Sequence, residues 1–166
     1  NISEITVDNL VELHAIDIRS SGLAELGKPE GYVQRQVEGW IKRYYNAQTE
    51  KIESMDKIAE WMRENIPAEH AAAFIHNDYK YDNIVLNPDD LSQIIAVLDW
   101  EMATVGDPLM DLATTLGYWA EPSDHPALQQ FSLTALPGNL SRQEVVERYA
   151  EKSGRSVSNI VFYFAY

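Results

Sequence analysis

Three residues have types and spacing that suit chemistry on phosphate groups. Asp78 and Asn83 belong to the polar stretch 76–83, which reads H-x-D-x-x-x-x-N, and Asp99 follows Asn83 sixteen residues later. A carboxylate can receive a proton from a reacting hydroxyl. Carboxylate and amide oxygens are also the ligands that Mg²⁺ prefers in proteins. An Asp, an Asn and a later Asp in this order occur in enzymes that transfer phosphoryl groups, so the spacing indicates that chemistry.

Short apolar runs predict the strands that would position these residues. The runs cover residues 71–75, 84–86 and 94–98, and Asp99 follows the last of them directly. Asn87, Pro88, Asp89 and Asp90 separate the second and third runs and favour a turn, because Asn and Asp bond their own backbone and Pro fixes φ. A hairpin folded at this turn would bring Asp99 back beside the polar stretch. The three side chains would then converge from two loop ends.

Two further motifs carry a resemblance to a known family. Residues 99–113 read D-W-E-M-A-T-V-G-D-P-L-M-D-L-A. With the 76–83 stretch, they resemble the C-terminal lobe of the aminoglycoside phosphotransferase family, which is similar in fold to the protein kinases. Within that family they look most like the kinase domains related to some acyl-CoA dehydrogenases. The resemblance implies an α+β, mostly α-helical fold, in which a small β-hairpin carries the catalytic and metal-binding loops.

The resemblance also implies ATP and Mg²⁺ as cofactors and roles for four residues. Asp78, at the loop apex, is expected to orient the acceptor hydroxyl and to accept its proton as the catalytic base. Asn83 and Asp99 are expected to bind Mg²⁺ and, through it, the nucleotide phosphates. Lys80 lies two residues after Asp78, where its ammonium could reach the transferred phosphate.

Other polar residues near these motifs have structural alternatives. His76 is expected to bond the backbone around Asp99 and to hold the loop in shape. Asp111 resembles the family carboxylate that accepts backbone N–H bonds from the catalytic loop, but a first-turn acid is also favoured by the helix dipole alone. Glu101 could contact a second metal or be a surface carboxylate, and we expect Asp82 to shape the loop.

Apolar residues at helical spacing predict the elements around this loop. Trp40, Tyr44, Tyr118 and Trp119 could line an acceptor pocket, although core packing is the simpler interpretation of aromatics at this spacing. His14 is expected to be a packing histidine, Asp107-Pro108 a helix start and Ser141–Glu144 a capping box. The predicted buried stripes are Val7, Leu10, Val11, His14 and Ile18; Val33, Gln36, Val37, Trp40, Ile41, Tyr44 and Tyr45; Met55, Ile58, Ala59, Met62 and Ile66; Leu109, Leu112, Ala113 and Leu116; Val145, Val146 and Tyr149; and Val157, Ile160, Val161 and Phe164.

Composition limits the remaining possibilities. The chain has 166 residues, of which 45% are hydrophobic, a length and balance that suit one globular domain. Asp and Glu outnumber Lys and Arg by 26 to 13, which argues against a nucleic-acid partner. Cysteine is absent, which excludes disulfides and thiolate metal sites. No apolar run reaches the roughly 20 residues of a membrane span. We expect a cytoplasmic location, and the sequence predicts no oligomeric state.

Nucleotide-binding motifs of a kinase N-terminal lobe are missing from the sequence. It contains no G-x-G-x-x-G loop and no V-A-I-K-like strand lysine. We therefore expect residues 1–166 to be the catalytic C-terminal lobe, without the N-terminal ATP-binding lobe, and to turn over little alone. The expected reaction transfers phosphate to an aminoglycoside-like, sugar-like or hydroxyacyl acceptor. The alternatives are a retired binding or regulatory module and a metal-dependent hydrolase.

Overall fold

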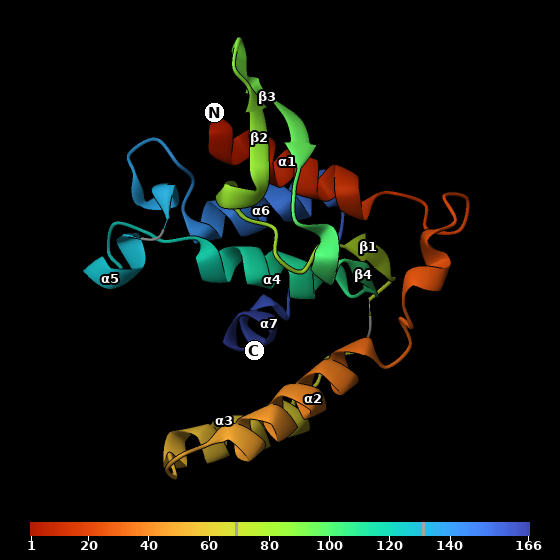
Figure 1. Cartoon of the computed structure of the whole chain (residues 1–166), viewed down its shortest axis with the longest axis vertical. Coiled ribbons are helices and arrows are strands. Elements are labelled where there is room, and N and C mark those ends of the chain that lie inside the picture. Colours follow the sequence, from red (N-terminus) through yellow and green to blue (C-terminus); the bar gives the residue numbers. More distant parts are fainter. Residues whose placement is uncertain (69, 131) are drawn as a thin grey trace.

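Helices make up most of the computed structural model, which describes residues 1–68, 70–130 and 132–166 (Figure 1). Two small antiparallel sheets complete the predicted α+β architecture. No helix within these ranges is long and apolar enough to cross a membrane. The elements are α1 (Ile2–His14), α2 (Tyr32–Ala47), α3 (Glu53–Glu64), β1 (Ala73–Ile75), β2 (Ile84–Asn87), β3 (Asp90–Val97), β4 (Thr104–Gly106), α4 (Pro108–Tyr118), α5 (Pro126–Gln129), α6 (Arg142–Ser153) and α7 (Ile160–Ala165).

The predicted hairpin is present as β2 and β3. Ile84 lies opposite Val97 in its register, and the side-chain oxygen of Asn87 accepts a 3.0 Å hydrogen bond from the N–H of Asp89 in the turn. β1 is shorter than the predicted 71–75 run and does not join the hairpin. It pairs instead with β4, an element that the sequence does not predict, because a three-residue strand has too little periodicity to recognise.

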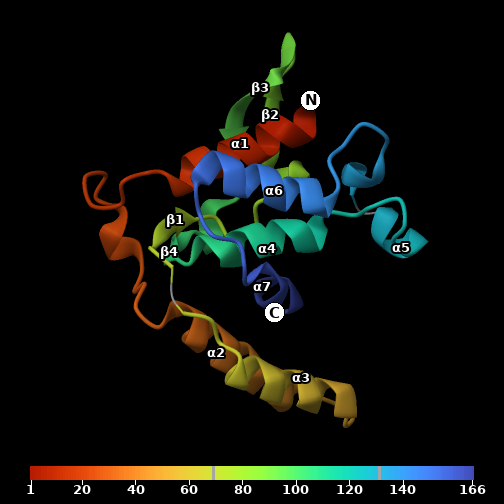
Figure 2. The same cartoon turned by 180° about the vertical axis from the view of Figure 1, so that it is seen from behind.

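The core lies where α1, α4 and α6 run side by side below the hairpin, with α7 against α4 (Figures 1 and 2). Leucines of α1 and α4 and Val145 and Tyr149 of α6 are buried there, as their helical spacing predicts. α4 begins as expected, since the Asp107 carboxylate accepts a 2.8 Å bond from the N–H of Leu109 and Pro108 occupies the first position. The capping box at the start of α6 is also confirmed.

α2 and α3 form a two-helix arm at the opposite end of the molecule from the hairpin (Figure 1). Val33, Val37 and Ile41 are buried as predicted, but the expected burial of Trp40 is wrong, since this side chain is 52% exposed. Tyr45 and Ile58 are exposed as well. A helix buries only the side chains that face a neighbouring element, so part of a wider apolar stripe remains exposed to solvent.

Two other helices differ from their predicted limits. α1 ends at His14, so Ile18 lies in the following segment. α7 begins at Ile160, and its buried residues are Phe162 and Tyr163. The predicted inward positions Val161 and Phe164 are 72% and 47% exposed. The Tyr163 hydroxyl donates a 2.9 Å bond to the Asp107 carboxylate at the start of α4, so the Tyr163 side of α7 faces α4 and the opposite side faces solvent.

Candidate active site

The loop between β1 and β2 brings three of the predicted site residues together. The Lys80 Nζ lies 2.9 and 2.8 Å from the two carboxylate oxygens of Asp78. The Asn83 side-chain amide donates to the same carboxylate at 3.0 Å and to the Asp78 backbone carbonyl at 2.8 Å. Asp78 is therefore held by two side chains from its own loop. The sequence analysis named both of them, Lys80 and Asn83, as candidate site residues.

The charge state of Asp78 follows from these contacts. Partial burial alone would raise its pKa, but the hydrogen bonds from Lys80 and Asn83 outweigh burial and lower the pKa below the ordinary aspartate value. The same pair raises the pKa of Lys80, chiefly through the bond to Asp78. At neutral pH the pair is a carboxylate beside an ammonium. Such a carboxylate can accept a proton from a hydroxyl that approaches one of its oxygens.

Asp99 stands on the segment that leaves the hairpin, next to residues 76–83, the predicted catalytic loop. The N–H of Leu98 donates a 2.8 Å bond to the Asn83 carbonyl, and His76 Nε2 bonds the Leu98 carbonyl at 2.8 Å. Asp99 itself has φ 65° and ψ 57°, a left-handed conformation that is uncommon outside glycine. The hairpin and His76 thus place Asp99 beside Asn83 in a defined backbone geometry. The contact of His76 is of the kind that the sequence predicts.

The donor atoms of Asn83 and Asp99 fit a magnesium ion. The Asn83 amide nitrogen is used by Asp78, and its oxygen accepts no hydrogen bond from any residue in the described ranges. The exposed Asp99 carboxylate likewise has no polar partner among residues 1–68, 70–130 and 132–166. Mg²⁺ is typically held by one or two protein oxygens, water and substrate phosphates. In the described chain no cluster of three or more acidic, histidine or cysteine ligands competes with this site.

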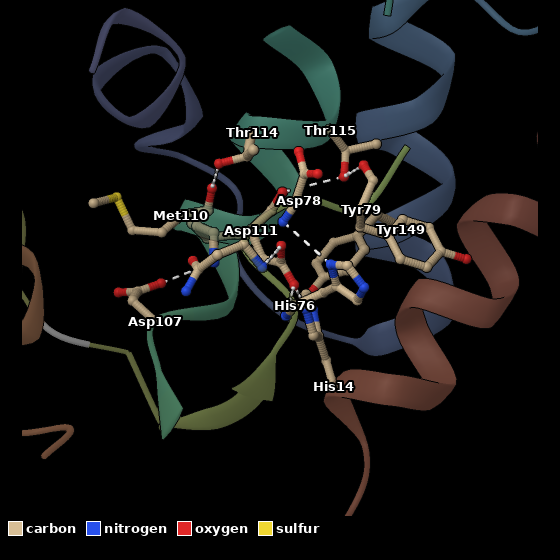
Figure 3. A network of polar contacts seen from close by, with 12 residues as sticks. His14, His76, Asp78, Tyr79, Asp107, Met110, Asp111, Thr114, Thr115 and Tyr149 are labelled. Atoms are coloured by element: carbon tan, nitrogen blue, oxygen red, sulfur yellow. Dashed lines mark hydrogen bonds and ion pairs between the residues drawn. The ribbon is translucent and has the colours of Figure 1, made fainter. Parts of the chain in front are cut away.

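Asp111 ties the catalytic loop to α4. Its carboxylate is fully buried and accepts backbone bonds from the N–H of His76 at 2.6 Å and of Asn77 at 2.8 Å (Figure 3). The helix dipole alone therefore does not explain the presence of an aspartate at position 111. Two charge-assisted bonds to consecutive N–H groups restrain the loop directly before Asp78.

His14 extends this network in a way that the sequence did not reveal. Its Nε2 lies 3.1 Å from the Asp111 carboxylate and its Nδ1 lies 2.7 Å from the Tyr149 hydroxyl (Figure 3). Because an ionised carboxylate only accepts, Nε2 carries the proton and Nδ1 accepts from Tyr149. His14 is buried and satisfied, as predicted, but its partner is the residue that anchors the catalytic loop. No local sequence pattern could reveal this contact, because His14 and Asp111 lie 97 positions apart in the chain.

Thr115 and Tyr79 complete the attachment of the loop. Thr115 Oγ1 donates a 2.9 Å bond to the Tyr79 carbonyl, and the buried Tyr79 hydroxyl bonds the Thr6 carbonyl and the Asn9 side chain on α1. The spacing of Asp111 and Thr115, one helical turn apart, could have indicated a shared face of α4. Glu101 and Asp82 are both exposed, and neither has a direct contact with the Asp78 carboxylate among the described residues.

A cleft of about 1220 Å³ opens between the α2–α3 arm and the α4–α7 side of the core. Asn77, next to Asp78, is one of its lining residues, and its side chain accepts a 3.3 Å bond from the Tyr32 hydroxyl. Trp40 and Tyr44 line the arm side, as the pocket interpretation predicts. Trp119 is 2% exposed and belongs to the core.

The fold and the loop together define a class of proteins, the phosphotransferases with a kinase-like C-terminal lobe. The chain belongs to the phosphotransferase enzyme family, whose model matches residues 2–145. The matched range includes the loop, the hairpin and α4.

Relatives and solved structures agree with this membership. Acyl-CoA dehydrogenase family member 11 is 35% identical over 97% of the chain in Gallus gallus and 37% identical over 90% in Homo sapiens. A Ralstonia eutropha structure assigned to the aminoglycoside phosphotransferases matches 98% of the chain with a TM-score of 0.85 and 30% identity. Macrolide 2'-phosphotransferase type I matches in fold, with a TM-score of 0.67 over 99% of the chain. The chain spans 21% and 19% of the two dehydrogenase relatives and 50% of each structure.

Proposed function

We propose that the chain is the C-terminal lobe of an ATP- and magnesium-dependent phosphotransferase that acts on a hydroxyl of a small molecule. The observation that carries this proposal is the position of Asp78 and its contacts. It is held by Lys80 and Asn83 on a loop restrained by Asp111, and its neighbour Asn77 lines a cleft of small-molecule size. Membership of the phosphotransferase enzyme family supports the reaction type.

In the proposed reaction, Asp78 accepts the proton of the acceptor hydroxyl. The acceptor oxygen then bonds to the γ-phosphorus of ATP as the bond to the β–γ bridging oxygen breaks and ADP leaves. The Lys80 ammonium, beside Asp78, would bind the transferred phosphoryl group. Asn83 and Asp99 would hold Mg²⁺, which would neutralise charge on the phosphates.

A second lobe would complete the nucleotide site. The sequence lacks both the glycine-rich loop and the strand lysine that hold nucleotide phosphates in kinases. We propose that an N-terminal lobe of the same protein supplies these groups, and that residues 1–166 alone bind nucleotide weakly. Transfer by this chain at the rate of the full-length protein would contradict this part of the proposal.

The charge of the cleft favours an anionic acceptor with an apolar part. Lys28, Arg35 and Arg43 line it, and none of the described lining residues is Asp or Glu, although the chain carries a net charge of −13. The Tyr44 hydroxyl is buried without a hydrogen-bond partner in the described structure and could bond a ligand. A polycationic aminoglycoside would meet like charges here. A hydroxyacyl compound fits better, and the acyl-CoA dehydrogenase names of the relatives point the same way.

The test is phosphate transfer from ATP by the full-length protein, with and without Mg²⁺, to aminoglycosides, sugars and hydroxyacyl compounds. We expect Mg²⁺-dependent transfer to one acceptor class, and loss of transfer with retained ATP binding in Asp78→Asn. Asp82→Asn, which removes an exposed carboxylate of the same loop, is the matched control. Phosphate release that needs no acceptor would indicate a hydrolase. Absence of ATP binding would indicate a retired module.

A further inference from the structure

One face of α4 contacts the catalytic loop at three successive points. Asp111, Thr115 and Tyr118 stand at positions i, i+4 and i+7 and therefore share that face. Asp111 holds the two N–H groups before Asp78, and Thr115 holds the carbonyl just after it. Tyr118, at the end of the helix, lies against Lys80. The first two contacts restrain the backbone of the loop, whereas the third contacts a side chain that the proposed reaction uses.

The contact between Tyr118 and Lys80 has cation–π geometry. The Lys80 Nζ lies 4.5 Å from the centroid of the Tyr118 ring while it forms the 2.8 Å ion pair with Asp78. Burial, followed by the neighbouring Asp78 carboxylate, raises the pKa of the Tyr118 phenol, in keeping with a hydroxyl near Asp78. Tyr118 is 48% exposed, unlike the buried Asp111 and Thr115, and core packing explains its position less well.

A lysine at this place needs restraint from outside the loop. Its ammonium is a strongly hydrated charge on four rotatable carbons, and a partly exposed ion pair restrains such a stem weakly. The Tyr118 ring covers one side of the ammonium and leaves the other sides to Asp78 and to an incoming phosphate. Tyr118 and Lys80 together line a smaller pocket beside the cleft-lining residue Gly117, which places the Tyr118 ring at the lysine.

We propose that Tyr118 is a positioning residue whose ring holds the Lys80 ammonium beside Asp78, ready for the transferred phosphoryl group. This inference rests on the proposed phosphotransferase function. It assigns the effect to the ring face more than to the hydroxyl. It also predicts that loss of the ring slows transfer without weakening the binding of either substrate.

The first measurement separates kcat from KM in the full-length protein. Tyr118→Leu is expected to lower kcat about 10-fold with KM for ATP and acceptor unchanged, a loss typical of one cation–π contact. Tyr118→Phe keeps the ring and is expected to retain kcat within about 3-fold. Tyr45→Leu is the control, because Tyr45 is a partly exposed tyrosine on the arm whose hydroxyl bonds Asp56. An unchanged kcat in Tyr118→Leu, or equal losses in the Leu and Phe variants, would overturn the proposal.

The second measurement does not depend on turnover. Acetylation of Lys80 by acetic anhydride, followed by peptide mass spectrometry, reports how well the ammonium is held and covered. We expect Lys80 to react at least about 3-fold faster in Tyr118→Leu than in the wild type, and at the wild-type rate in Tyr118→Phe and Tyr45→Leu. Equal rates in Tyr118→Leu and the wild type would refute the positioning role. If no acceptor is phosphorylated by the wild type, the proposed function fails, while this measurement still decides the contact.

Discussion

The catalytic loop and the α2–α3 arm are built in opposite ways. Buried groups from α1 and α4 hold the loop through Asp111, Thr115 and Tyr79. The arm packs mainly within itself, apart from contacts such as that of Trp61 with Phe162, and exposes Trp40 and the Arg63–Glu38 ion pair. Both regions border the same cleft.

This difference suits the two regions to different tasks, the loop to the reaction and the arm to recognition of the acceptor. A proton acceptor must be held within a fraction of an ångström, and buried charge-assisted bonds provide that precision. Apart from Tyr32, whose hydroxyl bonds Asn77, residues on the arm can change without disturbing those bonds. We infer that the loop determines the chemistry and that the arm determines the acceptor. The predictions below test this division.

The largest effect is expected at Asp111. In Asp111→Asn the amide can accept only one of the two backbone N–H bonds well, and its own N–H₂ meets a donor. Loss of a charged acceptor from a buried network should lower the free energy of unfolding by about 3 kcal/mol. Urea unfolding of the chain measures this loss. Asp56→Asn on the exposed arm is the control. Equal losses of unfolding free energy in the two variants would contradict the proposed difference between the loop and the arm.

His14 should show the next largest effect. His14→Ala leaves the Tyr149 hydroxyl buried without its acceptor and removes one bond from Asp111, a loss of about 2 kcal/mol in the free energy of unfolding. Tyr149→Phe alone should cost about 1 kcal/mol. The double variant should cost less than the sum, because the two side chains share one bond. Strict additivity would show that the bond contributes nothing.

Trp40 should affect binding and not stability. In the full-length protein, Trp40→Ala is expected to raise the KM for the acceptor about 10-fold, since an aromatic wall of the cleft is lost. The kcat and the KM for ATP should stay within about 2-fold of the wild type. Steady-state kinetics with the acceptor found in the panel measure all three. A fall in kcat with constant KM would assign the arm to the reaction after all.

The smallest effects are expected at two surface ion pairs. Asp8 pairs with Arg148 at 2.7 Å between α1 and α6, and the bond to Arg148 lowers the pKa of Asp8 despite partial burial. Because the folded pKa is the lower one, this stabilisation is present above the ordinary aspartate pKa of about 3.9 and is lost as pH falls through the folded value. Asp8→Asn should lower the Tm by about 2 °C at pH 7 and by nothing in strong acid. Glu38→Gln on the arm should leave the Tm unchanged at both pH values.

Local signals in the sequence predicted much of the fold and the candidate site. Asp107-Pro108 and the Ser141–Glu144 box act within one helical turn, so they determine where α4 and α6 begin. The Asn-Pro-Asp-Asp turn joins neighbouring strands, so the hairpin beside the catalytic loop followed from it. The loop spacing brought Asp78, Lys80 and Asn83 together because all three belong to eight consecutive residues.

Only the tertiary structure decided what depends on contacts between distant segments. The pairing of β1 with β4, the bond of His14 to Asp111 and the contact of Tyr118 with Lys80 all join residues about 30 or more positions apart, and no local pattern specifies such partners. The exposure of Trp40 and Phe164 likewise depended on which neighbour each helix meets. A helical stripe shows that a helix has an apolar face, but the neighbouring elements decide how much of that face is buried.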